Sequence, residues 1–327
     1  MSPALALPAH ERWFVDSAAG DWSFFLRPVP LVVTALVVVV AVTWRLVALR
    51  IDRPELPWLR RLGDLAPWVP RLLGIHLGVA LLALAAAGMF VTPSVDDLHG
   101  IGGTALLLIE AGLGVWLITG FQQRWAAALT LLLGPVMVLF TGPMALLECA
   151  NLAAVAAFLV IAPAGADRHG AASLSPNQLR SALFALRAGV GVALIALAFT
   201  EKFTNPSMAR ATLDAFPALN VFSVIGLDVP TDVFVVIAGG VELLFGLLVL
   251  SGAFPQVAVL VAMVPFNATL FLFGQTELVG HLPVYGVFLA LLVYGSNPAT
   301  AAAVRWLPSR TDVLMVNRRP AAVTANP

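Results

Sequence analysis

Long apolar stretches follow one another along most of the chain, and they constrain its fold more than any other feature. Each is close to the roughly 20 residues that an α-helix needs to cross about 30 Å of hydrocarbon. Backbone groups cannot stay unpaired in lipid, so these stretches predict helices rather than open strands. Nine spans are predicted, at residues 28–45, 72–91, 101–120, 125–141, 144–163, 181–201, 233–252, 256–273 and 281–296.

The composition excludes a soluble domain. Hydrophobic residues make up 60% of the 327 residues and charged residues 11%, whereas soluble domains contain about 45–50% and about 25%. This much apolar surface would aggregate in water. The formal net charge is zero, so no basic surface indicates nucleic acid as a partner. We therefore predict an all-α, polytopic membrane protein whose first partner is membrane lipid.

The basic residues predict how the chain is oriented. If the N-terminus lies outside, four of the 18 Lys and Arg residues fall on the outer side, which leaves 14 inside. The outer four are Arg12, Arg27, Lys202 and Arg210. Positive residues concentrate on the cytoplasmic side of membrane proteins. We therefore expect a multi-pass protein of the cell membrane, with its N-terminus outside and its C-terminus in the cytoplasm.

An internal repeat divides the chain. Residues 110–120 and residues 242–252 both read E-x3-G-x5-G. Each motif lies in a group of four predicted spans, 72–163 and 181–296, and four spans return the chain to the same side. The two four-helix units are therefore predicted to be parallel repeats. Before them lie a surface segment, one extra span and a basic inner loop (1–71), and after them an inner tail (297–327).

Two glutamates occupy the interior of predicted spans. Glu110 and Glu242 are the first residues of the two repeat motifs. A charged side chain at mid-bilayer costs about 2.5–3.5 kcal/mol on insertion scales, so such residues face the bundle interior and are functional candidates by default. The alternative is a structural role, in which each carboxyl group locks neighbouring helices through a hydrogen bond.

More polar residues gather around Glu242. Lys202, the only lysine, ends the preceding span next to Glu201. The others are Asn267, Glu277, His281 and Tyr285. Such a group is suited to holding a quinol head group, relaying protons or binding a small polar solute. The alternative is a set of ordinary interfacial side chains, with Lys202 extended to the lipid head groups. The catalytic candidates are Glu242, Lys202, Glu277 and His281, and the cofactor-binding candidates are Asn267, Tyr285 and Glu110.

The depth of Glu242 below the outer end of its helix determines whether Lys202 can contact it. At 1.5 Å per residue, Glu242 is expected about 13 Å below the outer end of its helix, and a lysine side chain reaches about half of that. A direct pair therefore requires Lys202 to enter the bilayer, or a water between the two groups.

The first repeat has its own polar residues, Glu148, Cys149 and Asn151. A neighbouring carboxylate does not activate a thiol, so Cys149 is interpreted as a small packing residue. No spacing requires a metal site, and no cofactor motif is evident.

The second repeat, about 181–296, resembles the DoxX/DoxD family of membrane proteins. The matching segments are Glu201-Lys-Phe-Thr-Asn-Pro206, Val241-Glu-Leu-Leu-Phe-Gly246 and Leu250-Ser-Gly252. The first repeat looks like a diverged copy that keeps Glu110 but has Phe90-Val-Thr-Pro93 where the lysine is expected. The resemblance implies a four-helix bundle in a membrane redox assembly. DoxD-like members belong to thiosulfate:quinone oxidoreductases, and DoxX-like members are linked to oxidative and thiol stress.

Three functions follow from this reading. The first is a membrane subunit of a quinone-linked or thiol-related redox system, with quinone as the cofactor and other redox subunits as partners. The second is a small-solute or proton-coupled transporter that uses Glu110 and Glu242. The third is a membrane scaffold without catalysis.

Overall fold

A computed structural model describes residues 20–308 apart from 52–54, 97, 168 and 274, and apart from the side chains of 271–273 and 275–277. Within these residues the protein is built of helices, with an isolated β-bridge and no strand, as predicted for an all-α chain. Seven helices are long and apolar enough to cross a membrane. They are Pro28–Ala48, Pro57–Ala86, Gly100–Thr119, Gln123–Thr141, Pro176–Phe203, Thr231–Ser251 and Leu278–Ser296.

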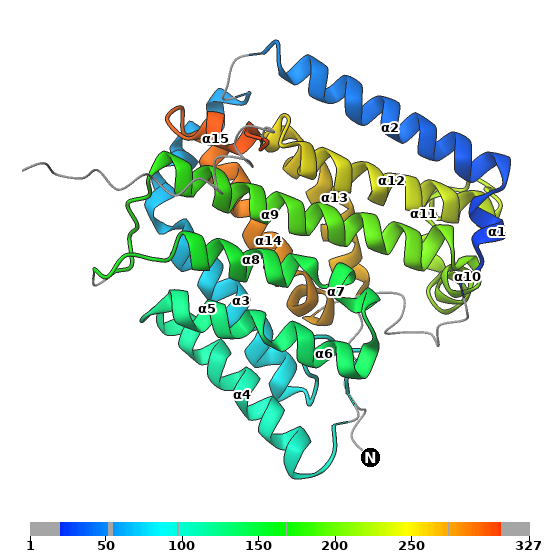
Figure 1. The fold of residues 1–327 in the computed structure, drawn as a ribbon. Coiled ribbons are helices and arrows are strands. Elements are labelled where there is room, and N and C mark those ends of the chain that lie inside the picture. The colour runs from blue at the N-terminus through cyan, green and yellow to red at the C-terminus, as the bar shows by residue number, and fades with distance from the viewer. Residues whose placement is uncertain (1–19, 52–54, 97, 168, 274, 309–327) are drawn as a thin grey trace, which may run out of the picture.

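Several of these segments contain more than one element (Figure 1). The elements of the long segments are α2 (Pro28–Ala48), η2 (Pro57–Trp68), α3 (Val69–Ala86), α4 (Gly100–Thr119), α5 (Gln123–Leu131), α6 (Leu133–Thr141), α9 (Pro176–Leu197), η3 (Ala198–Phe203), α12 (Thr231–Ser251) and α14 (Gln275–Ser296). The remaining elements are α1 (Trp22–Phe25), α7 (Met144–Glu148), α8 (Ala150–Ile161), α10 (Pro206–Ala215), η4 (Pro217–Leu219), α11 (Val221–Val224), α13 (Pro255–Phe273) and α15 (Ala301–Arg305).

One of the nine predicted spans is shorter than expected. The span predicted at 144–163 is split into α7 and α8 at Cys149, whose ψ of 15° departs from helical geometry. The span predicted at 256–273 lies on α13, which covers it from Pro255 to Phe273. The structure thus has seven candidate membrane-spanning helices among the described residues, with α8 and α13 as further apolar helices.

The same close helix pair occurs in both predicted repeats. In the first, α3 packs on α4, and a Cβ added to Gly78 would lie 2.5 Å from the carbonyl oxygen of Gly114. In the second, α9 packs on α12, and a Cβ added to Gly191 would lie 2.9 Å from the carbonyl oxygen of Gly246. Only glycine allows the two backbones to approach this closely.

The fourth helix of each predicted unit contacts the first helix of the other. Helix α8 packs on α9, and α14 packs on α3. These contacts join the two halves around a shared core of buried side chains, including Leu73, Val155, Leu186 and Phe288. Helix α2 packs along α12 at the edge of this core, to which it contributes Ala41 (Figure 1).

One end of the bundle collects the segments predicted to be inside. Arg45 at the end of α2 donates to the carbonyl oxygens of Ser251 and Arg305, at 2.9 and 3.3 Å. The buried Gln256 side chain accepts from the Leu56 amide and donates to the Ser296 hydroxyl. The inner loops therefore lie at a single end. The structure does not assign that end to the cytoplasm, so the orientation of the termini stays a prediction.

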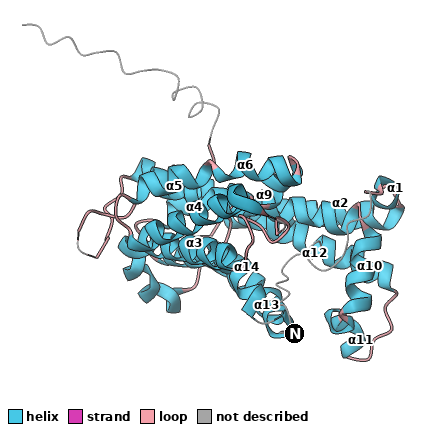
Figure 2. Ribbon diagram, turned by 90° about the horizontal axis from the view of Figure 1, so that it is seen from below, coloured by secondary structure: helices cyan, strands magenta, loops and turns pink. Residues whose placement is uncertain are grey.

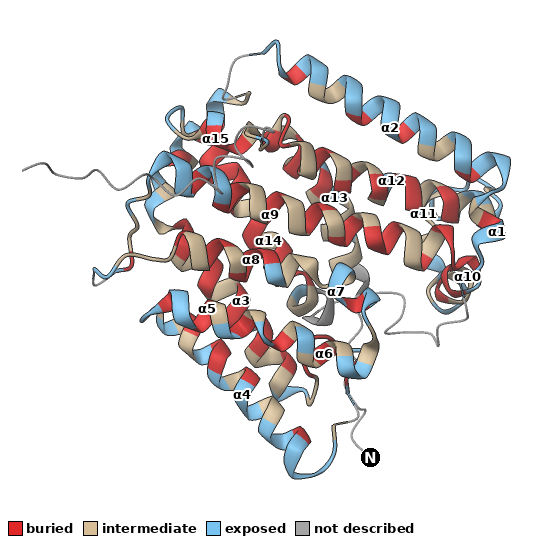
Figure 3. Cartoon of the chain, in the orientation of Figure 1, coloured by how far each residue is buried: buried red, intermediate tan, exposed pale blue. Residues whose placement is uncertain are grey.

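The surface agrees with lipid contact. Most of α2 is exposed (Figure 3), and its exposed side chains are almost all apolar. They include Val32, Leu36, Val39 and Leu46, which are 55–65% exposed. An apolar face of this kind is what a membrane helix presents to hydrocarbon. At the opposite end from the arginines, α10 and α11 project beside the bundle (Figure 2).

The segment predicted as an inner tail, 297–327, begins with a packed element. Helix α15 contacts α9 and α14, and Val304 is fully buried. Residues 309–327, which include the rest of this tail, lie outside the described residues.

Candidate functional site

A change of helix type positions the central charges of the candidate site. Helix α9 widens into a π-helical turn, η3, which carries Glu201 and Lys202. The turn is closed by Thr204, whose amide and hydroxyl both donate to the carbonyl oxygen of Phe199, at 2.9 and 2.8 Å. Such turns interrupt α-helices most often at functional sites.

Lys202 contacts two carboxylates. Its ammonium lies 3.0 Å from Oε2 of Glu242 on α12 and 3.6 Å from Oε2 of Glu201. The Glu242 and Lys202 side chains are 20% and 14% exposed, and the Glu201 side chain is 2% exposed. The three residues, called the ion triad below, therefore form a continuous carboxylate–ammonium–carboxylate contact away from bulk solvent.

A direct pair between Lys202 and Glu242 is expected only if Lys202 enters the bilayer, or otherwise through a water, and the structure shows the direct contact. A Cβ added to Gly239 would lie 3.2 Å from Cβ of Lys202, so Lys202 sits beside α12 only three residues before Glu242. At 1.5 Å per residue this is a difference of about 4.5 Å. The reason is that α12 extends beyond the end of α9, so the two helix ends are not level.

Glu110 has a different partner. It is fully buried on α4, and both carboxylate oxygens accept from the amide of Val91, at 3.0 and 3.1 Å. Val91 has a φ of 62°, in the left-handed region. The partner of Glu110 is thus a backbone amide of the Phe90–Pro93 segment, whereas Glu242 contacts Lys202. The structure places Glu110 inside the protein rather than on a surface open to a cofactor.

The other candidates form a second group around Phe266 of α13. The Tyr285 hydroxyl lies 3.3 Å from the carbonyl oxygen of Phe266 and 3.5 Å from Oδ1 of Asn267. The His281 ring packs 4.7 Å from the Phe266 ring. Asn267, His281 and Tyr285 are therefore brought together on α13 and α14, the last two predicted spans, as expected. The side chain of Glu277 lies outside the described residues.

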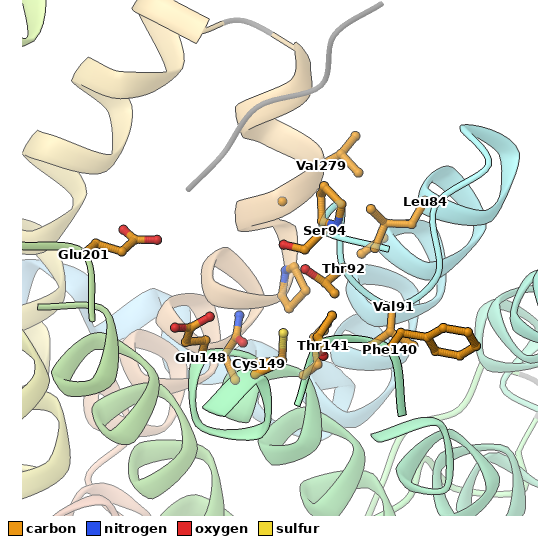
Figure 4. A pocket seen from close by; sticks show the side chains of 17 residues that line it. Leu84, Val91, Thr92, Ser94, Phe140, Thr141, Glu148, Cys149, Glu201 and Val279 are labelled. Atoms are coloured by element: carbon orange, nitrogen blue, oxygen red, sulfur yellow. The ribbon is translucent and has the colours of Figure 1, made fainter. Parts of the chain in front are cut away.

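A cavity of about 350 Å³ opens where the two halves meet. Its walls come from α3, the loop after it, α6, α7, α8, η3 and α14. Its polar lining residues are Thr92, Ser94, Thr141, Glu148, Cys149, Asn151 and Glu201. Figure 4 shows Glu201 facing the cavity from one side, with Glu148 and Cys149 on another. Glu201 therefore links the cavity to the ion triad.

The sequence does not predict the cavity. It shows Glu148, Cys149 and Asn151 only as the polar residues of the first predicted repeat, with Cys149 interpreted as a packing residue. The helix break at Cys149 brings these three residues to the cavity wall. In the described part of the chain no three His, Cys, Asp or Glu side chains lie close enough to hold a metal ion.

Comparison with known proteins identifies no relative: no family model, no curated protein and no solved structure matches the chain. The resemblance of residues 181–296 to the DoxX/DoxD family therefore rests on its motif residues alone.

Proposed function

We propose that the chain binds a small proton-exchanging molecule in the cavity between its halves and passes protons through the ion triad. The observation that carries this proposal is the position of Lys202, which contacts Glu242 on one side and the cavity-lining Glu201 on the other. Ionisable residues within membrane helices mark proton and ion pathways.

The distances suit proton transfer. General acids and bases act over about 2.6–3.2 Å, or through one water. The 3.0 Å contact between Lys202 and Glu242 is within that range, and the 3.6 Å contact to Glu201 is slightly beyond it. A proton taken up by Glu201 from a bound molecule can be exchanged with Lys202, which gives one to Glu242.

The molecule we propose is a quinol or a thiol compound, handled as part of a membrane redox assembly. This is what the DoxX/DoxD resemblance implies. Oxidation of a quinol releases two protons and two electrons, and the triad accepts protons while a redox subunit of the assembly accepts electrons. The cavity volume of about 350 Å³ falls within the range of small-molecule sites.

A second candidate function, proton-coupled transport of a small polar solute, is supported by where the cavity lies. Substrate sites of many transporters lie between two internal repeats. We propose that 72–163 and 181–296 are such repeats, related by an axis along the membrane normal. The matched Gly78–Gly114 and Gly191–Gly246 contacts support this relation. In this proposal α8 and α13 also cross the membrane, which gives nine spans.

Proton movement tests the proposal directly. The full chain would be reconstituted into vesicles containing a pH-sensitive dye, and proton entry driven by a potassium diffusion potential would be recorded, with and without a short-chain ubiquinol. Glu201→Gln and Glu242→Gln keep side-chain shape but remove a titratable proton, so each should slow proton entry by about tenfold or more. Asp64→Asn, at an exposed site on η2, is the matched control.

Equal proton entry in the unmodified chain and both Gln variants would contradict the relay and leave the scaffold role. To separate the two candidate functions, the protein would be purified from its native membrane in mild detergent. Bound quinone and co-purifying redox subunits support the redox assembly. Solute uptake that follows an imposed pH gradient supports transport.

A further inference from the structure

We infer that Glu110 is a positioning residue, which sets the shape of the cavity wall by holding Val91 in a strained backbone conformation. This inference concerns the shape of the cavity, so it stands whether or not the ion triad carries protons. It gives a specific role to the buried carboxyl group that the proposed function does not use.

The cavity wall next to Glu110 is a tight loop at the end of α3. The amide of Phe90 donates to the carbonyl oxygen of Val95 at 2.9 Å, and the amide of Val95 donates to the carbonyl oxygen of Thr92 at 3.0 Å. The amide of Thr92 also donates to the carbonyl oxygen of Phe90 at 2.6 Å, and these two residues form an isolated β-bridge. These bonds close the 90–95 loop, in which the chain reverses within a few residues.

Val91 is the strained residue of this loop. Its φ of 62° is in the left-handed region, which a β-branched residue rarely adopts. Strained residues of this kind persist only where the surroundings over-determine them, and they cluster at functional sites. No glycine relieves the strain at position 91, so something else must hold the conformation.

Glu110 supplies that restraint. Its two oxygens accept from the Val91 amide at 3.0 and 3.1 Å, and the carboxyl group is fully buried on α4. The apolar neighbours are fixed as well, since Phe90 is fully buried and Val91 is 7% exposed in a cluster with Leu113 and Met137. The loop is therefore clamped at its amide and at its side chains.

The clamp acts on the cavity because the next residues form its wall. Val91, Thr92, Pro93 and Ser94 all line the cavity, whereas Glu110 does not. In Figure 4 Thr92 and Ser94 lie near Cys149 of the opposing wall. Removing the Glu110 carboxyl group should release the Val91 conformation and move these residues, which widens access to Cys149.

The chain carries its own reporter for this movement. Cys149 lines the cavity and is the only cysteine, so a small maleimide reacts at a single place. The reaction rate would be measured on the purified full chain in detergent for the unmodified protein, Glu110→Ala, Val91→Gly and the double variant. Glu110→Ala should raise the rate by about threefold or more, as expected when a local restraint is lost.

The double variant distinguishes positioning from simple packing. Glycine adopts a positive φ without strain, so the backbone conformation at position 91 should no longer depend on Glu110 in Val91→Gly. Glu110→Ala should therefore change the Cys149 rate much less in the Val91→Gly background than in the unmodified chain. An unchanged rate in Glu110→Ala alone, or an equal increase in both backgrounds, overturns the inference. If Glu110→Ala does not fold, recovery of folding in the double variant supports the inference, and failure of both to fold overturns it.

Discussion

At the residue scale, Lys202 joins charges that belong to different elements. Its ammonium meets Glu242 at 3.0 Å and Glu201 at 3.6 Å, and all three side chains are largely buried. The carboxyl group of Glu110 instead accepts from the backbone amide of Val91. The two glutamates that begin the matching motifs are therefore satisfied in different ways, one by a backbone amide and one by an ammonium group.

The pairing of Lys202 and Glu242 makes a stability prediction. Removal of one member leaves the other charge in a low-dielectric site, so Lys202→Met and Glu242→Leu should each destabilise the protein by about 2 kcal/mol or more. Because the two residues share one interaction, the double variant should lose less unfolding free energy than the two single variants lose together. Thermal unfolding of the purified variants in one detergent measures this. Additive losses would show that the pair is not coupled.

Some of this residue-level detail could be predicted from the sequence. The sequence identifies Glu242 because a carboxyl group inside an apolar span is costly, and Lys202 because it is the only lysine and ends the preceding span. The partner of Glu110 could not be predicted, because every residue except proline offers a backbone N–H group and only the loop geometry selects Val91. The cavity was equally hidden. Its lining residues, Glu148 and Glu201 among them, come from segments that only tertiary packing brings together.

At the scale of elements, arginines join the helix ends opposite the cavity. Arg187 of α9 is fully buried and donates to the carbonyl oxygens of Leu250 and Trp306. The Arg45 side chain donates to the carbonyl oxygens of Ser251 and Arg305. The Arg305 side chain donates to the carbonyl oxygen of Ala48. These carbonyl groups lie at helix C-termini, where orphan acceptors and the helix dipole both favour a cation. The arginines therefore hold α2, α9, α12 and α15 in register.

Arg187 is the most consequential of these arginines. Its guanidinium group spans two carbonyl oxygens from different elements, a geometry that the compact lysine ammonium does not reproduce. Arg187→Lys should therefore destabilise the protein by about 1–3 kcal/mol, through a buried carbonyl group left without its donor.

Arg210→Lys is the matched control. Arg210 binds Asp232 at 2.6 and 3.0 Å, but the two side chains are 42% and 45% exposed. An exposed ion pair contributes about 0–1 kcal/mol to stability. Arg210→Lys should therefore lower the free energy of unfolding by less than Arg187→Lys does. Equal losses at Arg187 and Arg210 in the same unfolding assay would refute the capping role of Arg187.

At the scale of the whole molecule, the two ends of the bundle differ in character. The arginine end holds Arg45, Arg187 and Arg305 among helix C-termini. The opposite end holds the cavity, the ion triad and the projecting helices α10 and α11 (Figures 1 and 2). The length of the apolar runs predicted where most helices lie. It could not predict that α8 is short, because the sequence is apolar on both sides of the break at Cys149.

The final prediction assigns these ends to the two sides of the membrane. The bias of basic residues places the arginine end in the cytoplasm and the cavity end outside. Two serines of matched size and exposure report on it: Ser173 in the loop before α9 and Ser223 on α11. After Cys149→Ser, each would be replaced by cysteine in turn and probed in intact cells with an impermeant thiol reagent. Ser223→Cys should react and Ser173→Cys should react only after lysis. The reverse pattern would invert the topology and open the cavity to the cytoplasm, so that the proposed protons would be exchanged with the cell interior.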